Sequence, residues 1–290
     1  QPTGTSMSIN ITPVEKQIID TVTIPPRPDA LLKVVDESKK ADPNIPVIAK
    51  AISGDIGISA AVLQVVNSPA FRRMNEIRSI DQAVMLLGLK RIIPLVKAVA
   101  LKGSMQQSEK LANFWKRAES TASASVMVAK LINNTALIDQ AYMLGLFHDA
   151  GVPIMFQRFS DYGEFLEQAE LNGWDHYLDE EVKRYQTSHS TIGTILAEKW
   201  ALPEEMINVI YNLHEVDGIY SSDELNQESL TLLSILKIAR NIVHYIEFGD
   251  YETHEWNNIR EPLQDYMDLS DAGLETIREK SVEAIKEEAG

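Results

Sequence analysis

Two adjacent residues, His148 and Asp149, are the pattern in this sequence best suited to chemistry. They follow an apolar segment at residues 141–147 and precede the small residues Ala150 and Gly151. Imidazole and carboxylate groups are suitable ligands for zinc, iron or manganese. Neighbouring side chains on a helix lie about 100° apart, but they can converge where the backbone turns at a helix end. The pair therefore indicates either a metal-ligating site or a structural pair that caps the helix.

The other residues capable of metal or nucleophilic chemistry are few. The chain has six histidines and no cysteine. The lack of cysteine excludes disulfides, zinc–thiolate sites and iron–sulfur clusters, and it fits a reducing compartment. Among the other histidines, His176, His244 and His254 lie in no motif, and we assign them no role.

The elements that must position these residues are helical. Apolar residues recur at nearly 3.6-residue spacing from Asp55 to residue 67, and Ser79 with Gln82 forms a capping box before a helix that Gly88 ends. Runs of alternating β-branched residues are absent from the sequence. We therefore predict an all-α fold. Further helices are expected over residues 89–102, 108–133, 188–200, 203–213 and 230–245, with Pro203 in the first turn of its helix.

Charge divides the chain into two parts. The net charge is −15, but residues 1–110 carry +4 and residues 111–290 carry −19. The change coincides with the polar segment 103–108, which is the best domain boundary. The acidic C-terminal part argues against a nucleic-acid partner, because phosphate contacts dominate that affinity.

Three other segments bear on organisation and location. Residues 217–228 and 249–260 are expected to be loose. The tail, residues 270–288, has a thin apolar stripe that either docks on the same domain or binds a partner or second copy. The longest uncharged stretch, residues 56–71, is too short and polar to span a bilayer. We expect a cytoplasmic protein that begins, at Gln1, inside a longer chain or after processing.

The segment from Gly145 to Gly151 resembles the "GLLHDIG" element of the HD superfamily. The chain as a whole resembles the HDOD family, the HD-related output domain of bacterial signalling proteins. Four further elements follow in the family's order and extend the resemblance over residues 24–245. They are residues 24–28 ("LPPLP"), 67–71 ("NSAxY"), 79–89 ("SIxxAixxLG") and 200–204 ("WGLPE").

The resemblance implies an N-terminal helical bundle packed on an HD-like helical bundle. On this basis we expect an N-terminal helical subdomain at residues 1–105, an HD-like subdomain at 106–248 and a C-terminal helical extension at 249–290. The basic stretch at residues 71–102 is either a docking surface for an acidic partner or nucleotide phosphates, or a solvated face that balances the acidic bundle.

The resemblance also implies a site. A working HD phosphohydrolase holds its metal with an early histidine, the His-Asp pair and a late aspartate, and the metal activates a bound water. His148 and Asp149 match the pair. Arg117 falls at the early histidine and Arg240 at the late aspartate. His189 matches a histidine of the dinuclear relatives.

Arginine at two ligand positions predicts a degenerate site. A guanidinium is always protonated, cannot ligate a metal and repels cations. No histidine lies in residues 1–147, so the loss of the first ligand does not depend on alignment register. We therefore expect no metal and no cofactor. His214 matches one member of a later His-His pair of the dinuclear relatives. We expect His189 and His214 near the pocket as remnants of the family's metal site.

If Asp149 is buried, it needs a partner, because an unpaired buried carboxylate is very costly. Arg240 is the first candidate and Arg117 the second. The alternative is that Asp149 accepts backbone N–H groups at a following helix N-terminus, near Gly151 and Val152.

The sequence thus predicts a non-catalytic regulatory or interaction module of bacterial signal transduction. Its expected partner is a protein of a signalling pathway, and a small nucleotide ligand and a dimer stay open. No membrane partner is expected. The alternative is a metal-dependent HD-type phosphohydrolase or phosphodiesterase acting on a nucleotide or cyclic dinucleotide.

Overall fold

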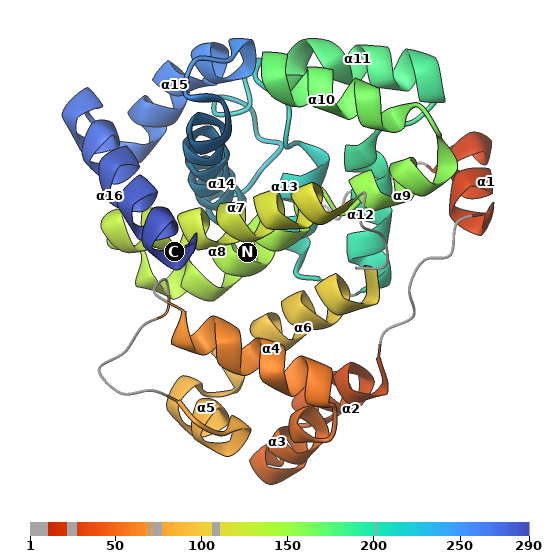
Figure 1. Cartoon of the computed structure of the whole chain (residues 1–290), viewed down its shortest axis with the longest axis vertical. Helices are drawn as coiled ribbons and strands as arrows, with labels where there is room; N and C mark the ends of the chain where they lie inside the picture. Colours follow the sequence, from red (N-terminus) through yellow and green to blue (C-terminus); the bar gives the residue numbers. More distant parts are fainter. Residues whose placement is uncertain are drawn as a thin grey trace. The chain divides into compact units, whose positions relative to one another are not determined.

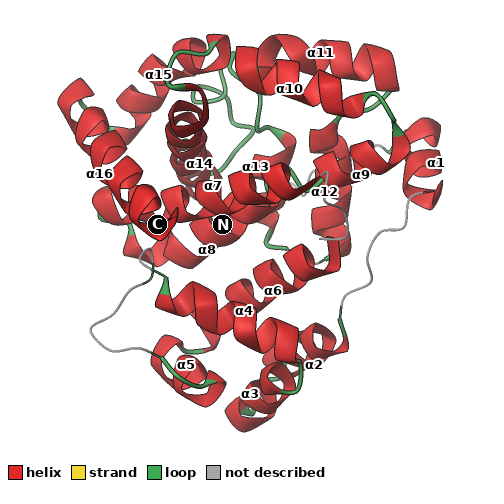
Figure 2. Ribbon diagram, in the orientation of Figure 1, coloured by secondary structure: helices red, strands yellow, loops and turns green. Residues whose placement is uncertain are grey.

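The computed structural model describes residues 11–21, 28–68, 71, 77–105, 111–200 and 202–289. All the regular elements in these ranges are helices, and Figure 2 shows no strand among them. The all-α prediction is confirmed. By their contacts the residues form two compact units. The first unit is Gln1–Ile24 with Phe147–Glu275, and the second is Pro25–Leu146 with Thr276–Gly290. The subdivision at residues 105 and 248 stays a prediction.

The two units contain different helices (Figure 1). The first unit has α1 (Pro13–Thr21), α9 (Val152–Arg158), α10 (Tyr162–Asn172), α11 (Trp174–Tyr185), α12 (His189–Lys199), α13 (Glu204–Tyr211), α14 (Gln227–Phe248) and α15 (His254–Met267). The second has α2 (Asp29–Ser38), α3 (Ile45–Ser53), α4 (Ile56–Asn67), α5 (Ile80–Leu87), α6 (Leu89–Met105) and α7 (Ala112–Leu131). The unit boundaries divide α8 (Ile138–Phe147) and α16 (Asp271–Ala289).

Local sequence explains where several helices begin and end. The Asp55 side chain accepts a hydrogen bond from the Ile58 N–H at the start of α4. Ser79 does the same for α5, where it accepts from the Gln82 N–H. Gly88 ends α5 with a φ of 73°, a conformation that costs a glycine little. These predicted caps are all present.

The helix expected from residue 108 is present as α7 from Ala112, and residues 106–110, on which its expected start falls, lie outside the described ranges. Two predictions about helix bounds need correction. Pro203 is the N-cap of α13 and not a first-turn residue. The region 249–260 is loose only as far as Thr253, which caps α15. The apolar signal of α15 is sparse, because its buried apolar side chains are only Trp256, Ile259 and Leu263.

The C-terminal tail forms α16, as expected, and its apolar stripe is buried within this chain. The stripe consists of Leu274, Ile277, Val282 and Ile285. This burial agrees with a helix that docks on its own chain. No single helix in the described ranges is long and apolar enough to cross a membrane, and the one pair that reaches that length together, α3 with α4, is bent by 107°.

Part of the basic stretch is paired inside the second unit. Arg91 donates to Asp139 at 2.6 Å, and Lys102 forms an ion pair with Glu119. Both acidic partners come from the acidic part of the sequence, so these pairs support the charge-balancing interpretation. Residues 72–76, with two of the predicted basic residues, lie outside the described ranges, as do residues 24–27, 69–70 and 201 of the family-like elements.

Candidate functional site

His148 and Asp149 lie in the turn between α8 and α9, as the sequence predicts. Gly151 in this turn allows a close backbone approach. A Cβ atom at Gly151 would lie 2.0 Å from the carbonyl oxygen of His189 and 2.7 Å from the backbone nitrogen of Gly193. The glycine therefore lets the turn contact the first part of α12, which brings Asp149 beside His189.

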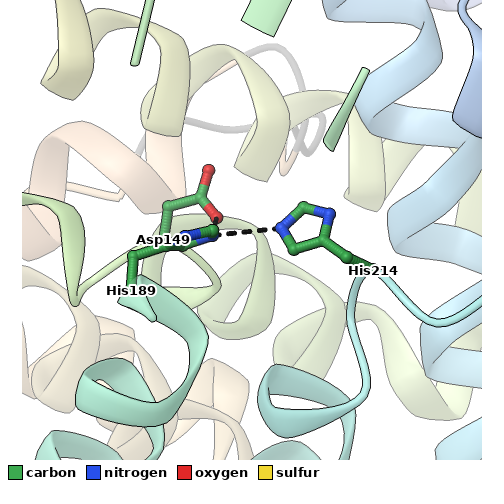
Figure 3. A group of neighbouring side chains, drawn as sticks. All are labelled: Asp149, His189 and His214. Carbon is green, nitrogen blue, oxygen red and sulfur yellow. Dashed lines mark hydrogen bonds and ion pairs between the residues drawn. The ribbon is translucent and has the colours of Figure 1, made fainter. Parts of the chain in front are cut away.

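Three predicted site residues converge in the first unit. His189 is the first residue of α12, and His214 lies in the turn after α13. Figure 3 shows the two rings facing each other, with the Asp149 carboxylate beside the His189 ring. The two Nε2 atoms are 3.0 Å apart, and the His189 Nε2 is 3.7 Å from the Asp149 Oδ1. All three side chains are buried.

Asp149 forms an ion pair with Arg240, the first of its expected partners. An Nη atom of Arg240, on α14, donates to the Asp149 Oδ2 at 2.9 Å, and the His148 Nε2 lies 3.0 Å from the same oxygen. Burial alone would raise the pKa of Asp149, but the charges of His148 and Arg240 hold that pKa well below its usual range. Among the described residues, no side chain caps the N-terminus of α9. The alternative in which Asp149 accepts backbone N–H groups at this N-terminus is therefore not observed.

Arg117, the second expected partner, belongs to the second unit. It is half-buried on α7, and its carbonyl oxygen accepts a hydrogen bond from the Thr121 hydroxyl at 2.9 Å. The group around Asp149 in the first unit therefore consists of the predicted His148, His189, His214 and Arg240.

The structure adds three charged residues that the sequence analysis missed. Glu181 on α11 lies 2.9 Å from the Nδ1 of His189. Glu255 on α15 lies 3.2 Å from the Nδ1 of His214, and it accepts from the Lys237 Nζ at 2.6 Å. The one available sequence signal was Lys237, a lysine between Leu236 and Ile238 in the apolar stretch of α14. The two glutamates lie in charged, polar segments that carry no such signal.

Carboxylates flank the two buried rings on their outer sides. The Nδ1 of His189 is hydrogen-bonded to Glu181, the Nδ1 of His214 to Glu255, and the two Nε2 atoms to each other. A carboxylate oxygen accepts hydrogen bonds when it is ionised, so this arrangement favours rings that carry a hydrogen on Nδ1.

The pKa values of the two rings are shifted in opposite directions. Burial lowers the pKa of His189, but Glu181 outweighs it and the net shift is upward. Burial dominates for His214 and lowers its pKa to about 4. Trp174, the first residue of α11, covers both rings, with ring centroids 4.1 Å from His189 and 5.2 Å from His214. Both rings thus lie in a site from which water is largely excluded.

The HD resemblance implies a metal centre, and these residues can be tested against it. Asp149, His189 and His214 each offer a donor atom, and these atoms lie within 4.8 Å of one another. Asp149 Oδ1 has no hydrogen-bond partner in the described part of the chain. However, Arg240 binds the other oxygen of this carboxylate and stands where the last ligand is expected. The resemblance also places an arginine, Arg117, at the position expected for the early ligand. The residues therefore do not fit the metal centre of an HD phosphohydrolase.

The regular elements that the structure describes are all helices. A His-Asp pair lies in the turn after one of them and faces further histidines from α12 and from the turn after α13. This is the architecture of an HD-like domain. The family model of the HDOD domain matches residues 24–216, and the chain belongs to this family.

Comparisons with individual proteins agree with the family and the fold. An uncharacterized protein of Treponema pallidum (strain Nichols) is 27% identical over 253 residues, which are 85% of this chain and 47% of that protein. The chain thus spans about half the length of this curated relative. A crystal structure from Shewanella amazonensis SB2B, described as a candidate metal-dependent phosphohydrolase, matches with a TM-score of 0.67 at 18% identity, over 95% of this chain and 96% of that one. A candidate signal transduction protein from Marinobacter aquaeolei VT8 matches with a TM-score of 0.58 at 18% identity, over 93% and 61%.

Proposed function

We propose that the chain is a non-catalytic regulatory or interaction module of bacterial signal transduction, in which internal ion pairs replace the HD metal centre. The observation that carries the proposal is the Arg240–Asp149 ion pair at 2.9 Å. Its guanidinium neutralises the carboxylate that a metal would otherwise bind, and it cannot itself activate a water molecule.

The burial of the site supports the same proposal. The side chains of His148, Asp149, His189 and His214 are between 0% and 6% exposed. A phosphohydrolase must bring a phosphorus atom next to its activated water. Within the described part of the chain, the burial of the four side chains does not favour such contact with a substrate. Their interactions instead serve to hold α12, α14 and α15 around the turn before α9.

A protein partner is the ligand class that we propose for the module. Large apolar side chains are exposed on α3 and α5, two helices of the second unit that contact each other. They are Ile45, Val47, Met85 (80% exposed) and Leu86. Exposed apolar patches are typical of protein-interaction surfaces. A small nucleotide and a second copy of this chain are the other ligands that the sequence analysis left open.

The second candidate function is a metal-dependent phosphohydrolase or phosphodiesterase acting on a nucleotide or cyclic dinucleotide. The specific observation in its favour is the convergence of donor atoms from Asp149, His189 and His214 within 4.8 Å. The description of the Shewanella structure belongs to the same class of activity.

Hydrolysis assays separate the two functions. The wild-type chain, an Asp149→Asn variant and a His244→Gln control are incubated with bis(p-nitrophenyl) phosphate or a cyclic dinucleotide in the presence of Mn²⁺ or Fe²⁺. We expect equal background rates in all three, and no bound metal whose amount depends on Asp149. Hydrolysis by the wild type and the control that Asp149→Asn abolishes would establish the phosphohydrolase instead.

A further inference from the structure

A second group of metal-ligating side chains lies on the surface of the first unit. It consists of Asp175 and His176, in the first turn of α11, and His254, the first residue of α15. Each residue offers one donor atom, and the three atoms lie within 4.8 Å of one another. The group shares no residue with the site around Asp149, and the sequence analysis assigned no role to either histidine.

The carboxylate of Asp175 lacks a partner on one side. Its Oδ2 contacts the Nδ1 of His254 and accepts from the Asn258 amide at 3.3 Å. Its Oδ1 is inaccessible to solvent and has no hydrogen-bond partner among the described residues. The side chain as a whole is only 6% exposed. Leaving a buried carboxylate oxygen unpaired is costly, and a cation bound by this carboxylate would add a favourable charge interaction.

The two histidines are placed to complete such a site. Their rings are 4.0 Å apart, centroid to centroid, at an angle of 37°. Both residues are exposed, so an ion can reach their rings from solvent. Asn258 also lies 3.1 Å from the Nδ1 of His254 and orients that ring. Neutral imidazole is the commonest protein ligand of transition metals.

The donor set determines the class of ion. Two imidazoles with one carboxylate suit Zn²⁺, Cu²⁺ or Ni²⁺, whereas Mg²⁺ and Ca²⁺ prefer sites built from oxygen atoms alone. The N-termini of α11 and α15 carry partial positive charge, which disfavours a cation. The carboxylate of Asp175 must offset that charge, so it is the ligand on which binding depends most.

We propose that Asp175, His176 and His254 bind one zinc-class divalent cation, which links the start of α11 to the start of α15. This link has a direct structural consequence. Asp175 follows Trp174, which covers the rings of His189 and His214, and His254 precedes Glu255, which contacts His214. A cation bound at the surface would therefore hold both helix starts against the buried histidine pair.

Calorimetric titration of the chelator-treated, tag-free full chain with Zn²⁺ tests this proposal. We expect the wild type and a His244→Gln control to bind the ion equally. His254→Gln and His176→Gln should each lose one equivalent or bind it about 10- to 100-fold more weakly, as when even a supporting partner of a metal ligand is removed. Zn²⁺ should also raise the melting temperature of the wild type and not that of His254→Gln. Circular dichroism checks that each variant is folded. Because both histidines are exposed, we expect their substitution to leave the fold intact.

Two results would overturn the proposal. The first is a wild-type chain that binds no Zn²⁺. The second is undiminished binding by both His254→Gln and His176→Gln. The Asp149→Asn variant distinguishes this site from the one considered for hydrolysis, since it should leave Zn²⁺ affinity at the surface site unchanged. Binding that depends on Asp149 and not on His254 would contradict both this proposal and the proposed function.

Discussion

Replacing Arg240 by methionine tests the ion pair on which the proposed function rests. Methionine keeps much of the length of the side chain and its packing but removes the guanidinium. Asp149 would keep His148 as a neighbour and lose its one fixed positive charge. Glu170 would also lose a cation, because its carboxylate lies 4.0 Å from the other Nη atom of Arg240.

The expected cost follows from burial. The side chains of Arg240 and Asp149 are 15% and 6% exposed. Breaking a buried pair by removing one partner typically costs about 3–5 kcal/mol, because it leaves an uncompensated charge. We expect Arg240→Met to lower the free energy of unfolding by an amount in this range. For a domain with about 5–15 kcal/mol of stability, such a loss is readily measured.

Urea unfolding followed by circular dichroism measures this loss, and two further variants make the result specific. Arg184→Met removes an ion pair with Asp161 whose partners are 47% and 45% exposed, and it should cost less than about 1 kcal/mol. The double variant Asp149→Asn with Arg240→Met removes both charges, so its cost should be smaller than the sum of the single costs by about 1–3 kcal/mol. A cost for Arg240→Met as small as that of Arg184→Met, or additive single costs, would refute the reasoning.

Two other predictions concern stability. Gly151→Ala should lower the free energy of unfolding by about 3 kcal/mol or more, because its Cβ would meet rigid backbone. In the control Gly103→Ala, on α6, the Cβ meets nothing within 4 Å, and the free energy of unfolding should rise by up to about 1 kcal/mol. Equal effects of the two substitutions in urea unfolding would contradict this prediction. Stability should also fall as pH falls from about 6.5 to about 4. In that range the unfolded chain protonates His214, whereas the folded chain, with a pKa of about 4, does not. The lowered pKa of Asp149 acts in the same direction at lower pH, where the unfolded carboxyl, with its ordinary pKa of 3.8, becomes protonated. The raised pKa of His189 adds stability that is lost as pH rises through that pKa. Melting temperatures should therefore be highest near neutral pH. A melting temperature that stays constant down to pH 4.5 would be inconsistent with these shifts.

Much of the helical architecture could be predicted from sequence because its signals are local. Apolar spacing and the caps at Asp55 and Ser79 act within a few residues, and the structure has both features. The start of α15 was missed because its buried side chains are few and polar residues surround them. Tertiary contacts, and not local periodicity, decide that such a segment is helical.

The sequence by itself predicted an incomplete HD ligand set, since no histidine precedes His148 in these 290 residues and this observation does not depend on alignment register. It also located the His-Asp pair at the end of a helix. Only the tertiary structure decided that Asp149 pairs with Arg240, 91 residues away, and that Glu181 and Glu255 hold the two buried rings. The physical reason is that ion pairing of buried groups depends on which side chains the fold brings within a few ångströms, and charged residues in polar helices show no sign in sequence of which will be buried.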